Sequence, residues 1–330
     1  MPRNTPLEHR LPILTIQNLK TYFFTDAGVA KAVDGLNLTL LQGESLGIVG
    51  ESGCGKSMTG LSILRLVPKP FGRIVSGRIL FNGSDILSIS EQEMIKVRGN
   101  KISMIFQEPM TSLNPVFTIG EQISETLRFH RKLSRKEGFD RSIELLTQVG
   151  IPSPELRIKD YPSQLSGGMR QRVMIAMALA CRPKIIIADE PTTALDVTIQ
   201  AQILDLMQKL REETDSAIIL ITHDLGVIAE NAQHVAVMYT GRVFEFAEVE
   251  ELFNHPLHPY TLGLMESIPR VGSRKDRLNT IPGLVPSVLE LPLGCKFSDR
   301  CSYSRPKCEE EEPDLLEYKP GHLVRCWKYV

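Results

Sequence analysis

The chain has 330 residues, a length that fits one large domain or a domain with an appendage. Hydrophobic residues make up 42% of the chain, which is enough for a packed core. Lys and Arg (38) nearly balance Asp and Glu (39), so the net charge of -1 gives no bulk electrostatic support for nucleic-acid binding.

The sequence contains no apolar run of the roughly 18–20 residues that cross a bilayer. The first residues also lack the apolar core of a signal peptide. We therefore expect a cytosolic chain that meets a membrane only through a partner.

Hydrophobic patterning divides most of the chain into three stretches. Short apolar segments alternate with helical ones up to about residue 115 and again from about residue 183, which indicates an α/β fold with a mostly parallel sheet covered on both faces. Helical patterns dominate between about residues 115 and 182, so we expect a helical insertion there. We expect strands at residues 11–24, 33–41, 45–49, 77–81, 101–106, 184–189 and 216–222, and helices at residues 58–66, 119–132, 142–149, 168–180 and 201–213.

Beyond about residue 255 the pattern changes again. Several prolines punctuate a region with little periodicity. We therefore predict a main domain over residues 1–255 and a small loop-rich module over residues 256–330.

One octapeptide indicates a nucleotide site. Gly50-Glu51-Ser52-Gly53-Cys54-Gly55-Lys56-Ser57 matches the phosphate-loop pattern G-x-x-x-x-G-K-[ST], and a strand before it and a helix after it argue against a chance glycine turn. The glycines permit a tight turn whose N–H groups face the phosphates, with Lys56 on the β- and γ-phosphates and Ser57 on Mg²⁺. The residues expected to contact ATP here are Gly50, Ser52, Gly53, Cys54, Gly55, Lys56, Ser57 and Met58.

Two acidic residues follow a strongly apolar segment. Ile185-Ile186-Ile187 predicts a buried strand that ends at Asp189 and Glu190. We expect Asp189 to hold Mg²⁺, through water, and Glu190 to polarise the attacking water. A strand that simply ends in acidic residues is the alternative, and it is less expected in a chain with a phosphate loop.

The order of these motifs resembles that of the ATP-binding cassette (ABC) proteins. Leu165-Ser166-Gly167-Gly168-Met169 resembles the signature of that family and lies between the phosphate loop and Asp189. The resemblance implies a P-loop ATPase with an antiparallel β subdomain and a helical insertion. It also implies that the chain binds ATP together with Mg²⁺.

The same resemblance assigns roles to single residues. It implies that Gln107 senses the γ-phosphate, helps to bind Mg²⁺ and lies in the loop that touches the membrane partner. It implies that His223 contacts the γ-phosphate and that Phe23 stacks on adenine. Asp196, in Ala194-Leu195-Asp196, would lie in the loop that links two nucleotide sites.

The signature also explains why two chains would act together. Ser166, Gly167 and Gly168 begin a predicted helix whose first N–H groups can bind an anion. In the family this site faces the γ-phosphate held by the opposite subunit, so ATP joins two cassettes and hydrolysis releases them. A monomer is therefore expected to bind ATP but to hydrolyse it poorly.

The C-terminal region narrows the resemblance. His258-Pro259-Tyr260-Thr261, Pro282-Gly283-Leu284-Val285-Pro286 and Gly294-Cys295-Lys296-Phe297 resemble the ATPases of peptide importers, which take up dipeptides, oligopeptides and in some members nickel complexes. This resemblance implies two transmembrane permease subunits, a second ATPase (related or identical) and, indirectly, an extracytoplasmic solute-binding protein. The chain would then lie peripherally on the cytoplasmic face of the cell membrane.

Four of the six cysteines lie close together near the C-terminus: Cys295, Cys301, Cys308 and Cys326. In a reducing cytosol such clustering favours metal binding over disulfides. The short knuckle spacing typical of structural zinc is absent, whereas iron–sulfur clusters also use four cysteines and accept looser spacing. The resemblance favours a [4Fe–4S] cluster, with zinc and unligated or disulfide-bonded thiols as the alternatives, and we expect the centre to stabilise the small module.

Two other functions compete with peptide uptake. An importer for another solute, such as nickel or an opine-like compound, would carry the same ATPase motifs. A soluble ABC protein acting on DNA or ribosomes is less expected, because the chain has one cassette and no sustained heptads.

Overall fold

The computed structural model describes residues 10–108, 112–193, 196–267 and 281–329. These residues form two compact units that are interleaved along the chain. Of the described residues, the first unit contains 10, 41–44, 88–108, 112–193 and 196–219, and the second contains 11–40, 45–87, 220–267 and 281–329. The predicted domain boundary near residue 255 stays a prediction.

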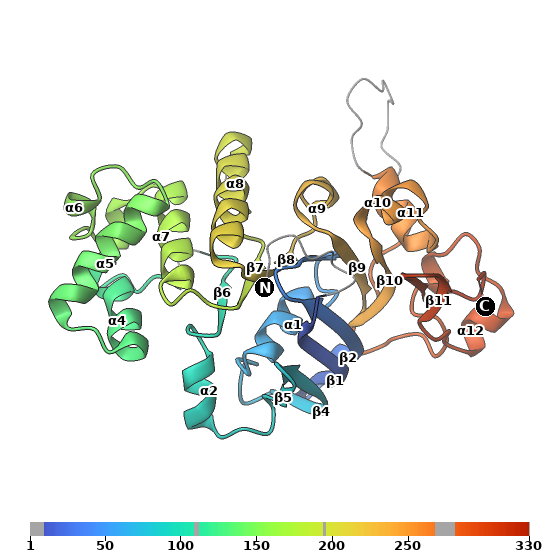
Figure 1. Ribbon diagram of the computed structural model, residues 1–330. Helices are drawn as coiled ribbons and strands as arrows, with labels where there is room; N and C mark the ends of the chain where they lie inside the picture. The colour runs from blue at the N-terminus through green and yellow to red at the C-terminus, as the bar shows by residue number, and fades with distance from the viewer. Residues whose placement is uncertain (1–9, 109–111, 194–195, 268–280, 330) are drawn as a thin grey trace. The chain divides into compact units, whose positions relative to one another are not determined.

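The first unit is mainly helical (Figure 1). Strands β6 and β7 pair in parallel, and the helices between them pack on one another as the expected helical insertion. Its elements are α2 (Glu91–Val97), β6 (Ile102–Ile105), α4 (Ile119–Arg131), α5 (Arg135–Gln148), α6 (Pro154–Arg157), the 3₁₀ helix η2 (Pro162–Gln164), α7 (Gly167–Leu179), β7 (Ile185–Asp189) and α8 (Val197–Thr214), with β8 (Ala217–Ile221) leading out of it.

Helix α5 begins earlier than the predicted start at residue 142. Its first turn holds Arg135 and Lys136, so apolar periodicity does not reveal it. The start is instead fixed by a capping box, in which Ser134 accepts a hydrogen bond from the Glu137 amide and the Glu137 carboxylate accepts one from the Ser134 amide. Thr118 and Glu121 begin α4 in the same way.

The second unit contains the expected antiparallel β subdomain. Strand β1 pairs antiparallel with β4, and β4 pairs antiparallel with β5. The strands lie in the order β2-β1-β4-β5, with β1 at Pro12–Thr25, β2 at Gly28–Leu41, β4 at Gly72–Phe81 and β5 at Ser84–Asp85.

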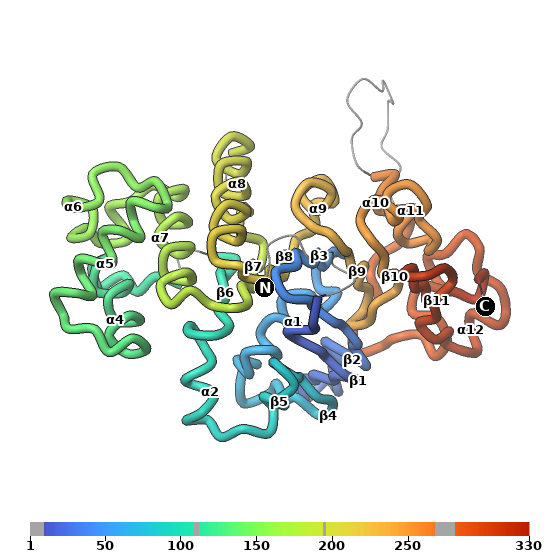
Figure 2. Tube along the Cα trace, viewed as in Figure 1, coloured from blue at the N-terminus to red at the C-terminus, as the bar shows by residue number. Residues whose placement is uncertain are grey.

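Five further strands of this unit pair in the order β11-β12-β10-β9-β3. Figure 2 shows the segments β3, β9 and β10 next to one another. Only β3 and β9 pair in parallel there, because the C-terminal strands return as antiparallel hairpins. These strands are β3 (Ser45–Val49), β9 (His234–Tyr239), β10 (Arg242–Glu248), β11 (Leu316–Lys319) and β12 (His322–Val324). The helices of the unit are α1 (Lys56–Ile63), α9 (Leu225–Asn231), α10 (Val249–Asn254), α11 (Pro259–Glu266), α12 (Pro306–Glu310) and the 3₁₀ helix η3 (Ser298–Arg300).

An aromatic core joins the C-terminal residues to this sheet. The ring of Tyr239, at the end of β9, lies 4.7 Å from that of Tyr260 and 5.4 Å from that of Phe297, centre to centre. All three side chains are buried. Such tilted and edge-on pairs add stabilisation beyond the apolar area they bury, so the C-terminal segment is packed as part of the unit.

Of the helices in the described ranges, none combines the length and the hydrophobicity that crossing a bilayer requires.

Candidate nucleotide site and cysteine cavity

The phosphate loop has the strand–loop–helix form that the sequence predicts. Every residue of β3 is buried, and α1 starts at Lys56 with Gly55 in the left-handed conformation at its N-cap. A Cβ atom on Gly50 would lie 2.2 Å from the carbonyl oxygen of Met238, and one on Gly55 would lie 2.2 Å from that of Ala32. Both positions therefore require glycine, since any side chain would push the loop off its support.

Lys56 lies folded against this loop. Its side chain is only 5% exposed, and Nζ donates hydrogen bonds to the carbonyl oxygens of Gly50 (2.7 Å) and Glu51 (3.0 Å). The ammonium group is thus held at the loop by neutral acceptors, where a phosphate group can compete for it. Cys54 beside it is fully buried, and burial raises the pKa of its thiol.

The three neighbouring aromatic residues of β1 differ in their partners. The Tyr22 hydroxyl donates a hydrogen bond of 2.5 Å to Asp34, and the Arg73 guanidinium lies over the Phe24 ring at 5.5 Å. Phe23 is half-buried and pairs across the sheet with Gly72. These contacts favour Phe23 over its neighbours as the aromatic available to a base.

His223, the other predicted site residue on the second unit, is exposed at the turn before α9. Its neighbour Asp224 caps that helix by accepting hydrogen bonds from the amides of Gly226 (2.8 Å) and Val227 (3.4 Å). These hydrogen bonds fix the residue that directly follows His223 at the start of α9.

Within the first unit, the structure brings two predicted residues into contact. Nε2 of Gln107, which follows β6, donates a hydrogen bond of 3.0 Å to Oε2 of Glu190, which follows β7. Thr193 Oγ1 donates to the same oxygen at 2.9 Å, a contact that the sequence did not predict. Asp189 is buried at the end of β7, and Glu190 has a φ of 44°, a left-handed conformation that is uncommon for residues other than glycine.

The signature residues begin helix α7. Ser166 is its N-cap and accepts a hydrogen bond of 3.4 Å from the Met169 amide. A Cβ atom on Gly168 would lie 3.1 Å from Ile199 Cγ2, so a side chain there would crowd α8. Asp196 caps α8 through the Ile199 amide at 2.9 Å, while Ala194 and Leu195 lie outside the described residues.

The four C-terminal cysteines line one cavity of about 280 Å³, together with residues that include His258, Phe297 and Trp327. Burial raises the pKa of Cys295 to about 12, so this group is a neutral thiol at physiological pH and a metal would have to displace its proton. In the part of the chain that the structure describes, no group of three or more His, Cys, Asp or Glu side chains is arranged to hold a metal ion. The prediction of a metal centre is therefore not confirmed, although the four thiols do share one cavity.

The sequence also gave no indication of an ion pair that reaches the phosphate loop. Arg300, in η3, contacts Glu51, the second residue of the loop, although 249 residues separate the two. A lone arginine in a proline-rich segment carries no sequence signal for such a partner.

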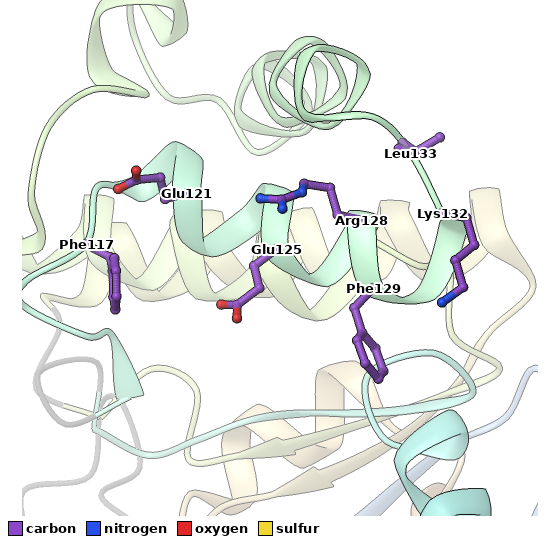
Figure 3. A pocket seen from close by; sticks show the side chains of 7 residues that line it. All are labelled: Phe117, Glu121, Glu125, Arg128, Phe129, Lys132 and Leu133. Carbon is purple, nitrogen blue, oxygen red and sulfur yellow. The ribbon is translucent and has the colours of Figure 1, made fainter.

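A second pocket, of about 680 Å³, lies on the first unit and is lined by α4 and the residues that flank it (Figure 3). Glu121, Glu125 and Phe129 follow each other at intervals of four residues along α4, which is the spacing of one helix face, and Phe117 lies just before the N-cap Thr118. The two phenylalanine side chains are half exposed, at 49% and 53%. We call these residues, with Arg128, Lys132 and Leu133, the α4 pocket.

Comparison with known proteins explains the combination of these features. A family model described as ABC transporter matches residues 33–193, and one described as the C-terminal region of oligopeptide/dipeptide transporters matches residues 244–308. A probable peptide ABC transporter ATP-binding protein of Sinorhizobium fredii is 52% identical over 96% of this chain and 95% of its own. The oligopeptide transport ATP-binding protein AppD of Bacillus subtilis is 53% identical over 96% of this chain and 97% of its own. The chain belongs to the peptide ABC transporter ATP-binding proteins.

Solved structures agree with this family. The ATP-binding cassette MJ0796, in a dimeric post-hydrolysis state with ADP and phosphate, is 29% identical and aligns with a TM-score of 0.65 over 72% of this chain and 98% of that one. The protein cbiO1 of Clostridium perfringens, part of the ABC transporter complex cbiONQ, is 30% identical, with a TM-score of 0.63 over 74% of this chain and 91% of that one. The fold is thus that of an ABC ATPase, and ATP hydrolysis is the activity of the chain.

Proposed function

We propose that this chain powers the uptake of dipeptides or oligopeptides by hydrolysing ATP on a pair of permease subunits. The phosphate loop carries the proposal, because its strand–loop–helix form and the buried Lys56 build a phosphate site. The peptide assignment is supported by relatives with peptide transport names, which are about 50% identical over nearly the whole chain. Residues 1–255 would form the cassette, and residues 256–330 the module that marks the importer.

The catalytic roles follow from the chemistry of the residues. Lys56 and the loop amides bind the phosphates, Ser57, Gln107 and Asp189 hold Mg²⁺, directly or through water, and Phe23 stacks on adenine. Glu190 accepts a proton from the attacking water. The hydrogen bond from Gln107 to Glu190 supports this role, because it orients the carboxylate from the loop that senses the phosphate.

Two copies of the cassette, or this chain and a related one, would enclose ATP between them. Ser166, Gly167 and Gly168 begin a helix of 13 residues, and its first N–H groups favour an anion. Such an anion would be the γ-phosphate of the partner's ATP. His223 would contact the γ-phosphate, and Asp196 would lie in the loop that links the two nucleotide sites. ATP then stabilises the closed pair and hydrolysis releases it.

The α4 pocket is the proposed docking site for a cytosolic helix of the permease. Its exposed phenylalanines offer an apolar floor, while Glu121 and Glu125 lie toward one end and Arg128 and Lys132 toward the other. A short amphipathic helix with charges in the opposite order would match this arrangement. Through such contacts the chain would sit peripherally on the cytoplasmic face, and the solute-binding protein would act only through the permease.

The four cysteines of the cavity are proposed to hold a [4Fe–4S] cluster. Four thiolates are the donor set of such clusters, and the common cavity supports the assignment. When bound, the cluster would join residues 295, 301, 308 and 326 and so stabilise a small module. Anaerobic purification with iron, sulfide and zinc analysis tests this proposal. About four irons per chain and an absorption band at about 400 nm support the cluster, and one zinc per chain refutes it.

The transport function is tested by reconstitution of the ATPase with its permeases in vesicles. We expect ATP hydrolysis to rise when the solute-binding protein arrives loaded with a peptide, and not when it carries nickel or an opine-like compound. Stimulation by nickel alone would overturn the peptide assignment and leave the ATPase assignment intact.

A further inference from the structure

The phosphate loop is anchored at Glu51 by the C-terminal part of the chain. Arg300 Nη1 lies 2.7 Å from Glu51 Oε2, and Nη2 lies 3.0 Å from Oε1. This two-point geometry is the strongest form of an arginine–carboxylate pair. The backbone amide of Glu51 also donates a hydrogen bond of 2.8 Å to the hydroxyl of Tyr260, so both the side chain and the main chain of this loop residue are held.

Arg300 is itself fixed in position. Its side chain is 4% exposed, and Nε donates to the carbonyl oxygen of Pro282 at 2.9 Å while Nη1 reaches the Tyr239 hydroxyl at 3.3 Å. The guanidinium lies 5.8 Å from the ring centres of Tyr239 and Phe297. A buried charge with this many partners cannot shift without losing several contacts, so it acts as a rigid support for Glu51.

The backbone of Arg300 belongs to a tight turn between two of the cavity cysteines. The amide of Ser298 donates to the carbonyl of Cys295 at 3.0 Å, and the amide of Cys301 donates to that of Ser298 at 3.2 Å. Arg300 thus stands between Cys295 and Cys301, on the segment that forms one wall of the cysteine cavity. If this turn shifts or becomes disordered, the Arg300 guanidinium moves with it, and Glu51 loses its ion-pair partner.

Glu51 matters to the loop because its carbonyl oxygen accepts a hydrogen bond from Lys56 Nζ. The orientation of the Glu51 peptide group therefore affects the position of the Lys56 ammonium and of the loop amides that follow Glu51. When only a fraction of molecules holds the loop in its binding shape, the apparent affinity for ATP falls by that fraction.

We propose that Arg300 is a positioning residue for ATP binding, which couples the turn at residues 295–301 to the phosphate loop through Glu51. The proposal rests on the phosphate-loop assignment made above. It makes the C-terminal module a regulator of nucleotide affinity within the same chain, with Arg300 as the connection.

The first test is a double-mutant cycle read by equilibrium binding of a fluorescent ATP analogue. We expect Arg300→Gln and Glu51→Gln each to weaken binding by roughly tenfold, and the double variant to be no weaker than either single one. Arg300→Lys should recover part of the loss, since it keeps the charge without the two-point geometry. Unchanged affinity in Arg300→Gln, or fully additive losses, would overturn the proposal.

Two controls separate this proposal from its alternatives. Lys56→Ala removes the phosphate-binding ammonium, so full binding by that variant would refute the phosphate-loop assignment itself. Arg305→Gln removes another arginine of the same module, whose Nη2 donates to the Trp327 carbonyl and does not reach Glu51. Equal losses in Arg305→Gln and Arg300→Gln would mean general loosening of the module and would refute the specific link.

Reciprocity gives an independent measurement. If the turn raises ATP affinity, then ATP must stabilise the turn by the same free energy. We expect a non-hydrolysable ATP analogue to slow amide hydrogen exchange at residues 295–301 in the wild type and to leave it unchanged in Arg300→Gln. In steady-state kinetics Arg300→Gln should raise KM for ATP with kcat unchanged, and a fall in kcat alone would contradict a role in positioning for binding.

Discussion

The carboxylate of Glu190 is held by the side chain of Gln107 at 3.0 Å, so the residues that follow β6 and β7 are joined within one unit. Thr193 adds a second donor at 2.9 Å to the same oxygen. Glu190 also has a left-handed backbone, and such strain persists where the surrounding contacts fix the residue. The carboxylate is therefore oriented before any nucleotide arrives.

Replacing this carboxylate should separate binding from turnover. Glu190→Gln keeps the size of the side chain and one acceptor oxygen for Gln107 and Thr193, but removes the carboxylate that would accept the proton. We expect ATP binding to persist and hydrolysis to fall by about 10²- to 10⁴-fold, the usual contribution of a general base. Phosphate release assays check this, with the exposed Glu212→Gln as the control. Hydrolysis at the wild-type rate would remove Glu190 from the catalytic role.

The ammonium group of Lys56 should account for much of the affinity for ATP. Lys56→Ala leaves the loop without the cation that now bonds the carbonyls of Gly50 and Glu51. We expect affinity to fall about 10- to 100-fold, the effect of losing one charge-assisted hydrogen bond. Titration calorimetry measures this against Lys209→Ala, which changes an exposed lysine of α8. Equal affinities in the two variants would contradict the assignment.

The cysteine cavity provides a matched pair of variants. We expect Cys301→Ser to lose iron and to loosen the C-terminal residues while the phosphate loop stays folded, because serine is a poor ligand for such clusters. Cys181→Ser, at a buried cysteine of the first unit, should keep its iron. Metal analysis and limited proteolysis of both variants provide the measurement, and an unchanged metal content in Cys301→Ser would exclude the cavity as the metal site.

Stability should depend on pH through one buried pair. His322 Nε2 lies 2.7 Å from Glu245 Oε1, and both side chains are almost fully buried. Burial alone would lower the pKa of His322, but hydrogen bonds and charge from Glu245 and Glu251 outweigh it and raise the pKa above its usual value. The stabilisation is therefore complete below the unfolded pKa of about 6.5 and is lost as the pH rises through the folded pKa.

His322→Ala tests this pair. It should lower the free energy of unfolding by about 3 kcal/mol near pH 6, because it leaves a buried carboxylate without its cation. The difference from the wild type should shrink as the pH rises through the folded pKa of His322, because the wild-type imidazole then loses its charge. Urea unfolding at several pH values gives the comparison, and a constant difference across that range would refute the role of protonation.

Docking at the α4 pocket can be tested with two similar phenylalanines. Phe129 lines the pocket and is 53% exposed, whereas Phe71 is 56% exposed on the other unit. We expect Phe129→Asp to reduce co-purification with the permeases severalfold, because it places a charge on the apolar floor. Phe71→Asp should have no such effect. Equal recovery of permease with both variants would place the docking site elsewhere.

Much of the fold was predictable because its signals are local. The five buried residues of β3, the glycines of the loop and the isoleucines of β7 each specify their own conformation, and β3 and β7 begin within one residue of the expected positions. The predicted start of α5 at residue 142 was wrong, because a capping box and not apolar spacing fixes its start. The hairpin of β11 and β12 escaped prediction, since short strands in a polar segment form only by pairing with β10.

The candidate site also combines features with local sequence signals and features that depend on the folded chain. Sequence motifs predict roles for Lys56, Glu190 and Ser166, because each motif is a run of neighbouring residues, and these roles stay predictions. The hydrogen bonds from Thr193 to Glu190 and from Arg300 to Glu51 depend on the folded backbone, and no pattern in the sequence indicates them. The sequence predicts Phe23 as the aromatic that stacks on adenine, and this stays a prediction. Its neighbours Tyr22 and Phe24 have other partners, Asp34 and Arg73.

The interleaved course of the chain has a consequence for synthesis on the ribosome. Gly50 packs against the backbone of Met238 in β9. The amide of Ser45, at the start of β3, donates a hydrogen bond to the side chain of Gln233, which lies 188 residues later in the chain. At ribosomal rates of about 5–20 residues per second, the loop emerges roughly 10 to 40 s before the strand that supports it. The helical segment between them is complete by then and can fold first. A nascent chain therefore gains its affinity for ATP only late in translation.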